Sequence, residues 1–563
     1  MNEFQLKAVN FDTNCVITAC LGSGKTTVLV NKAKRILSNS NHYLIGVTFS
    51  KNSADELGER LVQLCGPSVV TQFKTGTFHS LAKRQLESYY GGKKLRILAN
   101  HERNLILRDL YNSMGSDRKY QDFVMQIDAF KSTTQPDMED DDYRIFVEYQ
   151  KILKGRQVYE FSDMILESVA LMQSGKMKPL YATHMMVDEF QDTDQSQYEW
   201  MKQNATLSKM ITTVVGDDDQ TIYGFRSAQG YHGMMQFKDE YKATLISLPI
   251  NYRCAPEILN PAAKLITRNT SRVDKNIQAH KQPGGKVDVK NFATRDNELT
   301  EMMSILQNEN PNEWAILGRT NKVLDIVELY LNDEGIECQR TKGDSFWEKR
   351  STGVFLGTLA SLFKDDWTML ASTLQFIGIP HSLTEKLRSV DENQWHLIVE
   401  KTQTQNSDKM SKTVQDFVAK RKLWRQLLQD FQVNSVCMLA EKYLKDFAYE
   451  GEQDLLKYAR KSLQKKKGSL QQRVAQVKLK KESKDQPSGV YITTMHGSKG
   501  LEFEKVWIVA AEDGESPLKD EPIEEERRLF YVAMTRAKQH LVISYSDSEG
   551  EMSPFLSESA LIR

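Results

Sequence analysis

The sequence is short of cysteine, of long apolar runs and of any excess of one charge. Its six cysteines are scattered through 563 residues without a Cys-x-x-Cys pair or a metal-ligand spacing. This pattern excludes a disulfide framework and a zinc site, and it indicates a reduced, intracellular protein. No apolar stretch approaches the about 20 residues that a membrane span needs, and the first residues lack the charged and then apolar order of a leader. We therefore expect a cytoplasmic protein with no membrane partner.

The charges balance, because 75 Lys and Arg face 75 Asp and Glu. A bulk polycation is excluded, so any contact with nucleic acid has to come from a local basic surface or from stacking. The length is sufficient for three or four domains of about 150 residues each.

A phosphate-binding loop is the clearest feature. Residues 15–18 are short and β-branched, as in a buried strand, and residues 28–37 carry apolar side chains at helical spacing. Between them, Gly22 and Gly24 let backbone N–H groups turn inward onto phosphate oxygens at a helix N-terminus. A strand, a glycine loop and a helix predict a P-loop. It consists of Ala19, Cys20, Leu21, Gly22, Ser23, Gly24, Lys25, Thr26 and Thr27.

Two side chains of this loop have predicted roles in nucleotide chemistry. Lys25 is expected to reach the β- and γ-phosphates, and the Thr26 hydroxyl is expected to ligate Mg²⁺. The alternative is a glycine-rich turn with a surface lysine, which does not account for the strand before it and the helix after it.

Paired carboxylates follow a second apolar strand, residues 183–187. Asp188 is expected to hold Mg²⁺ through water, and Glu189 to orient and deprotonate the attacking water. Together with the P-loop, this pair predicts an NTPase site. A further strand, residues 213–216, leads to Gln220, which we expect to sense the γ-phosphate.

Gln5 lies just before the P-loop strand. Its amide offers a donor and an acceptor that fit N6 and N7 of adenine. An ordinary surface glutamine on an N-terminal amphipathic helix is the alternative, and a single glutamine does not decide between them.

Polar and aromatic residues also follow two other predicted strands. At the carboxyl edge of a parallel sheet, where ligands bind, Phe49 is placed to stack on a base. Thr77 and His79 are placed to hold backbone phosphates. The alternative for Phe49 and Phe78 is that both are core aromatics.

A third group, Tyr223, Phe225 and Arg226, comes directly after Gln220. Two aromatics and a cation suit base stacking and phosphate contact. An aromatic turn packed into the core is the competing interpretation.

These stretches resemble the ordered motifs of superfamily 1 DNA helicases of the UvrD/Rep type. The resemblance implies an α/β fold with two RecA-like P-loop NTPase motor domains, parallel sheets flanked by helices, each with a helical insertion. Cys20 and Leu21 replace the Gly-Ala pair usual in this family, which leaves the shape of the loop open. The matching segments, in order, are Gln5 and residues 19–26, 48–50, 77–79, 188–193, 216–226, 251–253, 494–503 and 525–537.

The resemblance also implies roles that the residues alone do not establish. Tyr252 is expected to stack on the adenine of ATP, and Glu502 to contact the ribose. Arg253 and Arg536 are expected to act as arginine fingers from the second motor domain. His496 belongs to a motif that contacts DNA in this family.

Composition and motifs suggest a division into six segments. Residues 1–85 and 159–250 are assigned to the first motor domain, with 86–158 as its helical insertion. Residues 251–369 and 486–563 are assigned to the second motor domain, with 370–485 as its insertion. The end of this second insertion is basic, with Arg460, Lys461 and Lys466 among its cations, which fits either a grip on duplex backbone or a solvated linker.

The resulting prediction is an ATP-dependent single-stranded DNA translocase and helicase, with 3′→5′ polarity implied by the resemblance. It would use ATP and Mg²⁺ and act on single strands and on single-strand/duplex junctions. One alternative is a translocating subunit that unwinds poorly without a nuclease, recombination or replication partner. Another is a non-hydrolysing nucleic-acid-binding scaffold, which Lys25, Glu189, Arg253 and Arg536 argue against. An RNA track and the biological pathway stay open.

Overall fold

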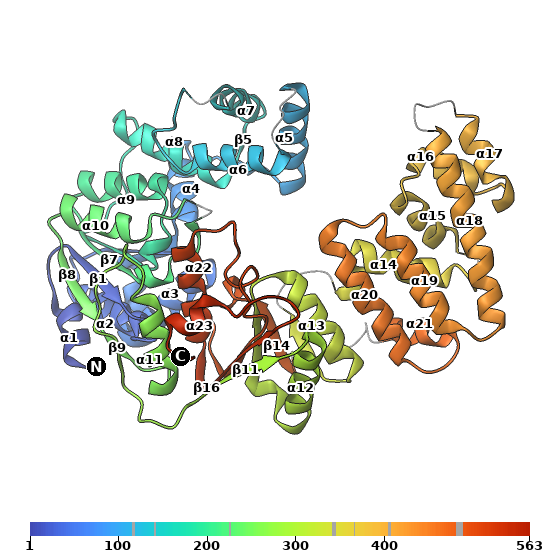
Figure 1. Ribbon diagram of the computed structural model, residues 1–563. Coiled ribbons are helices and arrows are strands. Elements are labelled where there is room, and N and C mark those ends of the chain that lie inside the picture. The colour runs from blue at the N-terminus through green and yellow to red at the C-terminus, as the bar shows by residue number, and fades with distance from the viewer. Residues whose placement is uncertain are drawn as a thin grey trace. The chain divides into compact units, whose positions relative to one another are not determined.

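The computed structural model describes residues 1–114, 119–139, 142–224, 227–340, 345–364, 366–402, 407–479 and 488–562. The chain forms two compact units (Figure 1). The first combines Met1–Lys286 with Asp520–Gln539 and Pro554–Arg563, and the second combines Val287–Lys519 with His540–Ser553. The predicted boundaries of the motor domains and insertions stay predictions. Residues 251–286, which were assigned to the second motor domain, lie in the same compact unit as the P-loop.

The first unit is built on a parallel sheet that, in the described residues, has six strands in the order β3-β2-β6-β7-β1-β8. Most of these strands are apolar and buried on both faces, as parallel strands usually are. Their bounds are β1 (Cys15–Ala19), β2 (Leu44–Thr48), β3 (Phe73–Thr77), β6 (His184–Val187), β7 (Ile211–Gly216) and β8 (Thr244–Leu248).

Helices cover both faces of this sheet. Alternate residues of β1 pack on opposite sides, so that Ile17 joins one core cluster and Val16 joins another. The first cluster includes α1 (Glu3–Asn10), α2 (Lys25–Leu37) and α3 (Lys51–Cys65). The second includes α4 (Phe78–Tyr89), α8 (Phe161–Gln173), α9 (Gln195–Leu207) and α10 (Gly230–Glu240).

A helical segment with its own core stands between α4 and α8. It comprises β4 (Arg96–Ile97), α5 (Asn100–Met114), α6 (Tyr120–Lys131), α7 (Tyr143–Gly155) and β5 (Val158–Tyr159). Its two short strands pair in parallel. The unit is completed by η1 (Pro67–Gln72), η2 (Phe190–Asp192), η3 (Asp218–Gln220), β9 (Ile250–Asn251), α11 (Pro256–Ile266), β10 (Gln278–Ala279), α22 (Ile523–Met534) and α23 (Pro554–Glu558).

The second unit contains another sheet, whose described strands follow the order β11-β16-β15-β12-β14-β13. The pairs β12–β14, β12–β15 and β13–β14 are parallel. Two parallel-sheet domains flanked by helices confirm the predicted fold class. The bounds are β11 (Lys286–Phe292), α12 (Arg295–Asn308), η5 (Pro311–Glu313), β12 (Trp314–Gly318), α13 (Asn321–Asp333), β13 (Cys338–Arg340), β14 (Val490–Thr494), η8 (His496–Ser498), β15 (Phe503–Ile508) and β16 (Ala537–Ser546).

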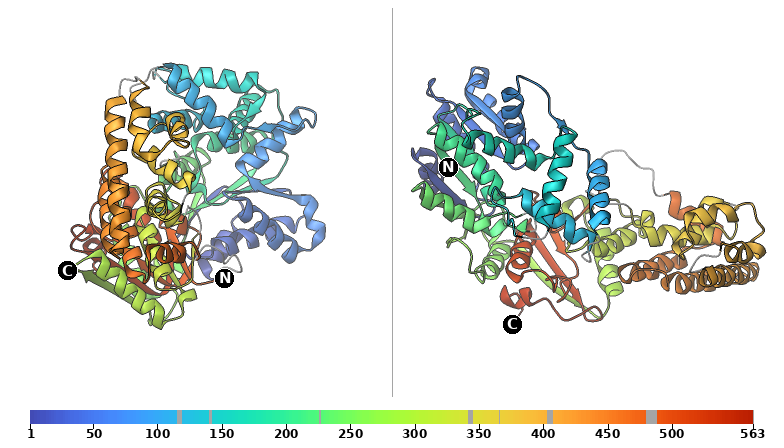
Figure 2. Two further views of the ribbon diagram at one scale, coloured as in Figure 1. Left: turned by 90° about the vertical axis from the view of Figure 1, so that its right-hand side faces the viewer. Right: turned by 90° about the horizontal axis from the view of Figure 1, so that it is seen from above.

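Helices make up the rest of the second unit, and Figure 2 shows α18 as a long rod among them. Their apolar faces share one core cluster with the sheet, because Leu456 and Leu463 belong to the same cluster as Trp314 and Ile316. The bounds are η6 (Phe346–Glu348), α14 (Arg350–Ala360), α15 (Trp367–Phe376), α16 (His381–Leu387), η7 (Glu392–Gln394), α17 (Trp395–Glu400), α18 (Ser407–Gln429), α19 (Val433–Lys445), α20 (Glu450–Lys465) and α21 (Leu470–Leu479).

The basic end of this segment is partly neutralised by carboxylates of the same unit. Lys466 Nζ lies 2.6 Å from a carboxylate oxygen of Asp333 in α13. Lys461 pairs with Asp296 of α12, and Arg460 with Glu441 of α19. Arg460 and Lys461 belong to α20, and Lys466 follows its last residue. The segment up to residue 479 is therefore made of packed helices and is not a solvated linker. In the part of the chain that the structure describes, no helix is both long and apolar enough to cross a membrane.

Candidate nucleotide and nucleic-acid site

The P-loop joins the carboxyl end of β1 to the N-terminus of α2. Gly22 and Gly24 have φ values of +66° and +79°, in the left-handed region that favours glycine. Gly24 is the N-cap residue of α2 and offers no side chain to its first N–H groups. Cys20 and Leu21 are buried, so the departure from the usual Gly-Ala pair falls on the inward side of the loop. The loop has the geometry of an anion-binding helix N-terminus.

Asn251 at the end of β9 holds the carbonyl side of this loop. Its Nδ2 donates to the Leu21 carbonyl at 2.7 Å, and the Tyr252 N–H donates to the Gly22 carbonyl at 2.9 Å. The Asn251 Oδ1 accepts from the N–H of Arg253 at 2.9 Å. A Cβ on Gly22 would lie 2.7 Å from the Arg253 Cβ, so the close approach requires glycine. Sequence reasoning placed Asn251 in a motif but gave it no role.

Lys25 and Glu189 meet at this site. Lys25 Nζ lies 2.7 Å from Glu189 Oε2. Burial disfavours the lysine charge, but the carboxylates of Glu189, Asp188 and Asp217 raise the pKa of Lys25. The two halves of the predicted NTPase site therefore lie together, with the lysine fully charged at neutral pH.

Asp188, at the end of β6, is the second carboxylate of the pair. Burial and the neighbouring Glu189 raise the pKa of Asp188 to about 7. Its Oδ1 accepts the Glu189 N–H at 2.9 Å. A partly buried carboxylate beside a second one favours a cation, and this observation fits the predicted magnesium role.

Gln191 contacts the predicted site, and sequence reasoning gave it no role. Its Nε2 donates to Glu189 Oε2 at 2.7 Å, and its Oε1 accepts the Asp217 N–H at 3.0 Å. Gln191 thus ties Glu189 to the loop after β7. Its place in the Asp-Glu-Phe-Gln-Asp-Thr segment indicated that it lies near the site, but did not indicate this contact.

Gln220 and Arg536 face each other in the same unit. Gln220 Nε2 donates to Asp217 Oδ2 at 2.6 Å, and Arg536 Nη2 donates to Gln220 Oε1 at 3.4 Å. Burial and the nearby Arg253 guanidinium lower the pKa of Arg536. Two guanidiniums near one another favour a polyanionic ligand. Both arginines belong to the compact unit that holds the P-loop.

Gln5 and Tyr252 are joined through Asn2. The N–H of Asn2 donates to Gln5 Oε1 at 3.0 Å, and Asn2 Nδ2 donates to the Tyr252 hydroxyl at 2.9 Å. Gln5 Nε2 donates to the Ser23 carbonyl at 3.0 Å. Gln5 is therefore a buried capping residue tied to the P-loop, and the interpretation as an ordinary surface glutamine is wrong.

The remaining hydroxyls of the loop differ in exposure. Thr26 and Thr27 are exposed at the start of α2. Ser23 is buried, and its Oγ has no hydrogen-bond partner in the described structure. An orphaned buried hydroxyl inside a phosphate-binding loop fits a ligand oxygen there. The described residues contain no cluster of three or more His, Cys, Asp or Glu side chains that could hold a metal.

Phe49 and Tyr223 form a stacked aromatic pair beyond β2 and η3, in which Phe49 is exposed and Tyr223 partly buried. Their ring centroids lie 5.8 Å apart with the planes 8° from parallel, and Phe49 is 42% exposed. Phe78 instead is buried against Trp200. The core alternative is therefore right for Phe78 and wrong for Phe49.

Thr77 and His79 mark the start of α4. The Thr77 Oγ1 accepts the Ser80 N–H at 3.2 Å and so caps the helix. Burial lowers the pKa of His79 to about 4, and its ring packs edge-on against Phe161 at 5.7 Å. His79 is neutral at physiological pH, so any phosphate contact from it is a hydrogen bond without a charge.

Comparison with known proteins accounts for this arrangement. The UvrD/REP helicase N-terminal domain matches residues 1–242, and the UvrD-like helicase C-terminal domain matches residues 246–480 and 457–548. The chain belongs to the UvrD/Rep helicase family.

Curated relatives of this family match nearly the whole chain. The putative ATP-dependent DNA helicase YjcD of Bacillus subtilis is 27% identical, over 97% of this chain and 78% of its own length. The ATP-dependent DNA helicase Rep of Escherichia coli is 25% identical, over 97% and 90%. The ATP-dependent DNA helicase PcrA of Staphylococcus epidermidis is 25% identical, over 97% and 83%.

Two predicted residues of this UvrD/Rep-family chain lie in the second unit. His496 opens η8 after β14, and Glu502 stands one residue before β15. Phe225 and Arg226 lie outside the described residues.

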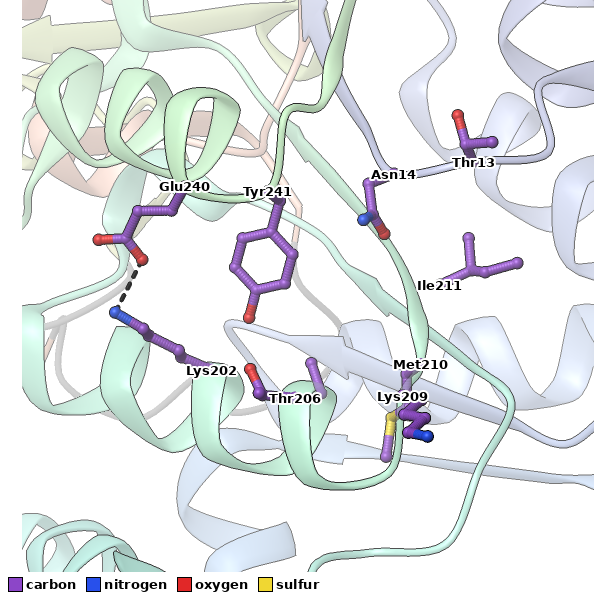
Figure 3. A pocket seen from close by; sticks show the side chains of 10 residues that line it. Thr13, Asn14, Lys202, Thr206, Lys209, Met210, Ile211, Glu240 and Tyr241 are labelled. Atoms are coloured by element: carbon purple, nitrogen blue, oxygen red, sulfur yellow. Dashed lines mark ion pairs between the residues drawn. The ribbon is translucent and has the colours of Figure 1, made fainter.

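A separate hollow of about 890 Å³ lies at the amino ends of the strands of the first sheet, where β1 and β7 begin (Figure 3). Asn14 and Ile211 line it at the strand ends. Lys202 and Glu240 form an ion pair of 2.9 Å beside the Tyr241 ring. Because the P-loop follows the other end of β1, this hollow is distinct from the nucleotide site.

Proposed function

We propose that this chain is an ATP- and Mg²⁺-dependent motor that translocates along single-stranded DNA with 3′→5′ polarity and unwinds duplexes. The observation that carries the proposal is the Lys25–Glu189 pair at 2.7 Å beside a left-handed glycine loop. Family membership supports an ATP-dependent DNA helicase, and the polarity comes from the resemblance.

In the proposed site, the nucleotide is held by groups already in place. The first N–H groups of α2, with Lys25, receive the phosphates. Tyr252 and Gln5 form the adenine side, since Asn2 holds both. Thr26 and Asp188 would hold Mg²⁺, a donor set that fits because this ion usually takes one or two protein oxygens besides phosphate and water. When bound, Mg²⁺ neutralises charge on the phosphates.

Glu189 orients the attacking water and accepts its proton. Gln191 fixes the Glu189 carboxylate. The ion pair between Glu189 and Lys25 must loosen when the lysine turns to a phosphate. Arg253 and Arg536 neutralise charge that develops at the γ-phosphoryl group. An arginine finger contributes about 10³- to 10⁵-fold in rate.

DNA contact is proposed at Phe49 and Tyr223. A base held between two rings needs about 7 Å, twice the 3.4 Å stacking rise, so the rings at 5.8 Å would move apart slightly to admit one. Stacking is independent of base identity, which suits a translocase. It also fits a chain without an excess of positive charge.

A coupled ATPase and unwinding assay on 3′-tailed, 5′-tailed and blunt DNA tests this function. We expect single strands to stimulate hydrolysis and only the 3′-tailed duplex to be unwound. Stimulated hydrolysis without unwinding would favour a subunit that needs a partner. No hydrolysis with any DNA or RNA would contradict the proposal.

A further inference from the structure

Three consecutive aspartates after β7 are all buried. Asp217, Asp218 and Asp219 have no exposed surface. Adjacent buried carboxylates are strongly unfavourable unless cations and hydrogen-bond donors compensate them. The structure supplies this compensation from the connection that follows α11.

Lys275 reaches all three carboxylates. Its Nζ lies 2.6 Å from Asp217, 2.7 Å from Asp218 and 3.0 Å from Asp219, and its side chain is fully buried. Burial disfavours its charge, but the three aspartates raise the pKa of Lys275 well above its usual value. Lys275 is therefore a permanent cation at the centre of the cluster.

Arg272 completes the cluster from the same connection. Its Nε and Nη2 donate to the two oxygens of Asp219, both at 2.9 Å. The Val273 N–H donates to Asp218 at 2.6 Å. A bidentate guanidinium and a backbone donor fix the geometry as well as the charge.

The network continues from Asp217 into the nucleotide site. The Asp217 N–H donates to Gln191, which donates to Glu189 at 2.7 Å. The Asp217 carboxylate accepts from Gln220, whose Oε1 accepts from Arg536. Each side chain in this series has both ends engaged, so a shift of Asp217 would move both glutamines.

We propose that Lys275 is a positioning residue for ATP hydrolysis. It acts through other side chains: it holds Asp217, so that Gln191 orients Glu189 and Gln220 orients Arg536. The inference rests on the proposed function and names a residue outside the motifs that the sequence pointed to. Arg272 supports the same loop through Asp219.

A second buried lysine provides a matched control. Lys131 in α6 is 2% exposed and pairs with Asp163 at 2.8 Å and with Glu160. It has the same chemistry and lies in the same unit. Its partners belong to the helical segment and to the start of α8, and not to the P-loop.

The test compares Lys275→Met with Lys131→Met in the full chain. The readouts are melting temperature, ATP affinity, kcat and KM with single-stranded DNA, and amide hydrogen exchange of nucleotide-free protein. We expect Lys275→Met to lower kcat about 10- to 100-fold with KM within threefold, because a misplaced catalytic group costs about 10² in rate. Hydrogen exchange should quicken at residues 189–193. Lys131→Met should lower the melting temperature and leave both kcat and this exchange unchanged.

Two further variants keep the test decisive. Lys275→Arg retains the cation and should recover a large part of kcat. Lys275→Met combined with Asp218→Asn reduces the uncompensated charge if the single variant does not fold, and it should still show low kcat and rapid exchange. A folded Lys275 variant with wild-type kcat and wild-type exchange overturns the inference. If the wild type hydrolyses no ATP, the proposed function fails, and the exchange comparison still decides whether Lys275 positions residues 189–193.

Discussion

Each of the two units buries a cluster of opposite charges, and the two clusters differ in what they connect. In the first, Lys275 and Arg272 face three aspartates, and hydrogen bonds lead on to Glu189 and Arg536. In the second, Arg295 pairs with Glu298 and with Glu512 at 2.7 Å. Similar buried ion pairs therefore have different roles in the two units.

The remaining hydrogen bonds of the second cluster stay within the second unit. Glu512 accepts the Ser546 N–H at 2.6 Å, and Glu298 accepts the Ala510 N–H at 3.3 Å and the hydroxyl of Ser544. These acceptors anchor α12 to the segment after β15 and to β16. Buried ion pairs contribute little net stability but are costly to break. Changes in this second cluster should therefore affect folding, whereas changes in the first should affect catalysis.

The largest expected effect is on Glu189, at the end of the first network. Glu189→Gln should lower kcat at least about 100-fold, because it removes the proposed general base. ATP and single-stranded DNA should still bind within several-fold. Steady-state hydrolysis and nucleotide titration measure both. Glu59→Gln, an exposed change on α3, is the control, and near-normal turnover in Glu189→Gln would refute the assigned base.

The second cluster should respond in stability and not in rate. Arg295→Met leaves two glutamates buried without their cation and should lower the free energy of unfolding by about 3–5 kcal/mol. Denaturant unfolding measures this loss. The kcat of the folded fraction should stay within twofold of wild type, and a large fall in that kcat would erase the contrast between the clusters.

A smaller effect is expected at Phe49, whose partner Tyr223 lies beyond the loop that the first cluster holds. Phe49→Ala should weaken single-strand binding by about 1–3 kcal/mol, the loss of one base stack. Fluorescence anisotropy at fixed salt measures the affinity. Tyr181→Ala removes a ring that is 75% exposed and serves as the control. Equal affinities for Phe49→Ala and wild type would exclude the stack.

The smallest expected effect is the pH dependence that two histidines of the first unit contribute to stability. Burial lowers the pKa of His79 and of His184 to about 4, below the ordinary 6.5. Between these values the two histidines bind protons in the unfolded chain and not in the folded chain, so they contribute a loss of stability as pH falls from 6.5 to 4. Above pH 6.5 these two histidines should contribute no pH dependence.

Melting temperature as a function of pH tests this sign. Replacing His79 and His184 with Gln should remove their contribution to the slope between pH 6.5 and 4, and replacing the exposed His101 should not. An unchanged slope in the double variant would show that other groups cause the acid sensitivity.

Short segments were sufficient to predict the phosphate loop, the carboxylate pair and the fold class. Gly22, Gly24 and Lys25 lie within one strand–loop–helix unit, so their chemistry is written in consecutive residues. The neutral state of His79 and the burial of Gln5 were beyond local reading, because the pKa and the exposure of a side chain depend on what packs around it.

Contacts between distant segments were decided by folding alone. Lys275 and Asp217 are 58 residues apart, and Asn251 and Leu21 are 230 apart. A lone lysine or asparagine has no periodicity or spacing that marks its partner. Consecutive residues thus determined which groups are candidates for phosphoryl transfer. Tertiary packing decided which groups hold these candidates in place, because an ion pair or a hydrogen bond requires proximity in space that sequence separation does not encode.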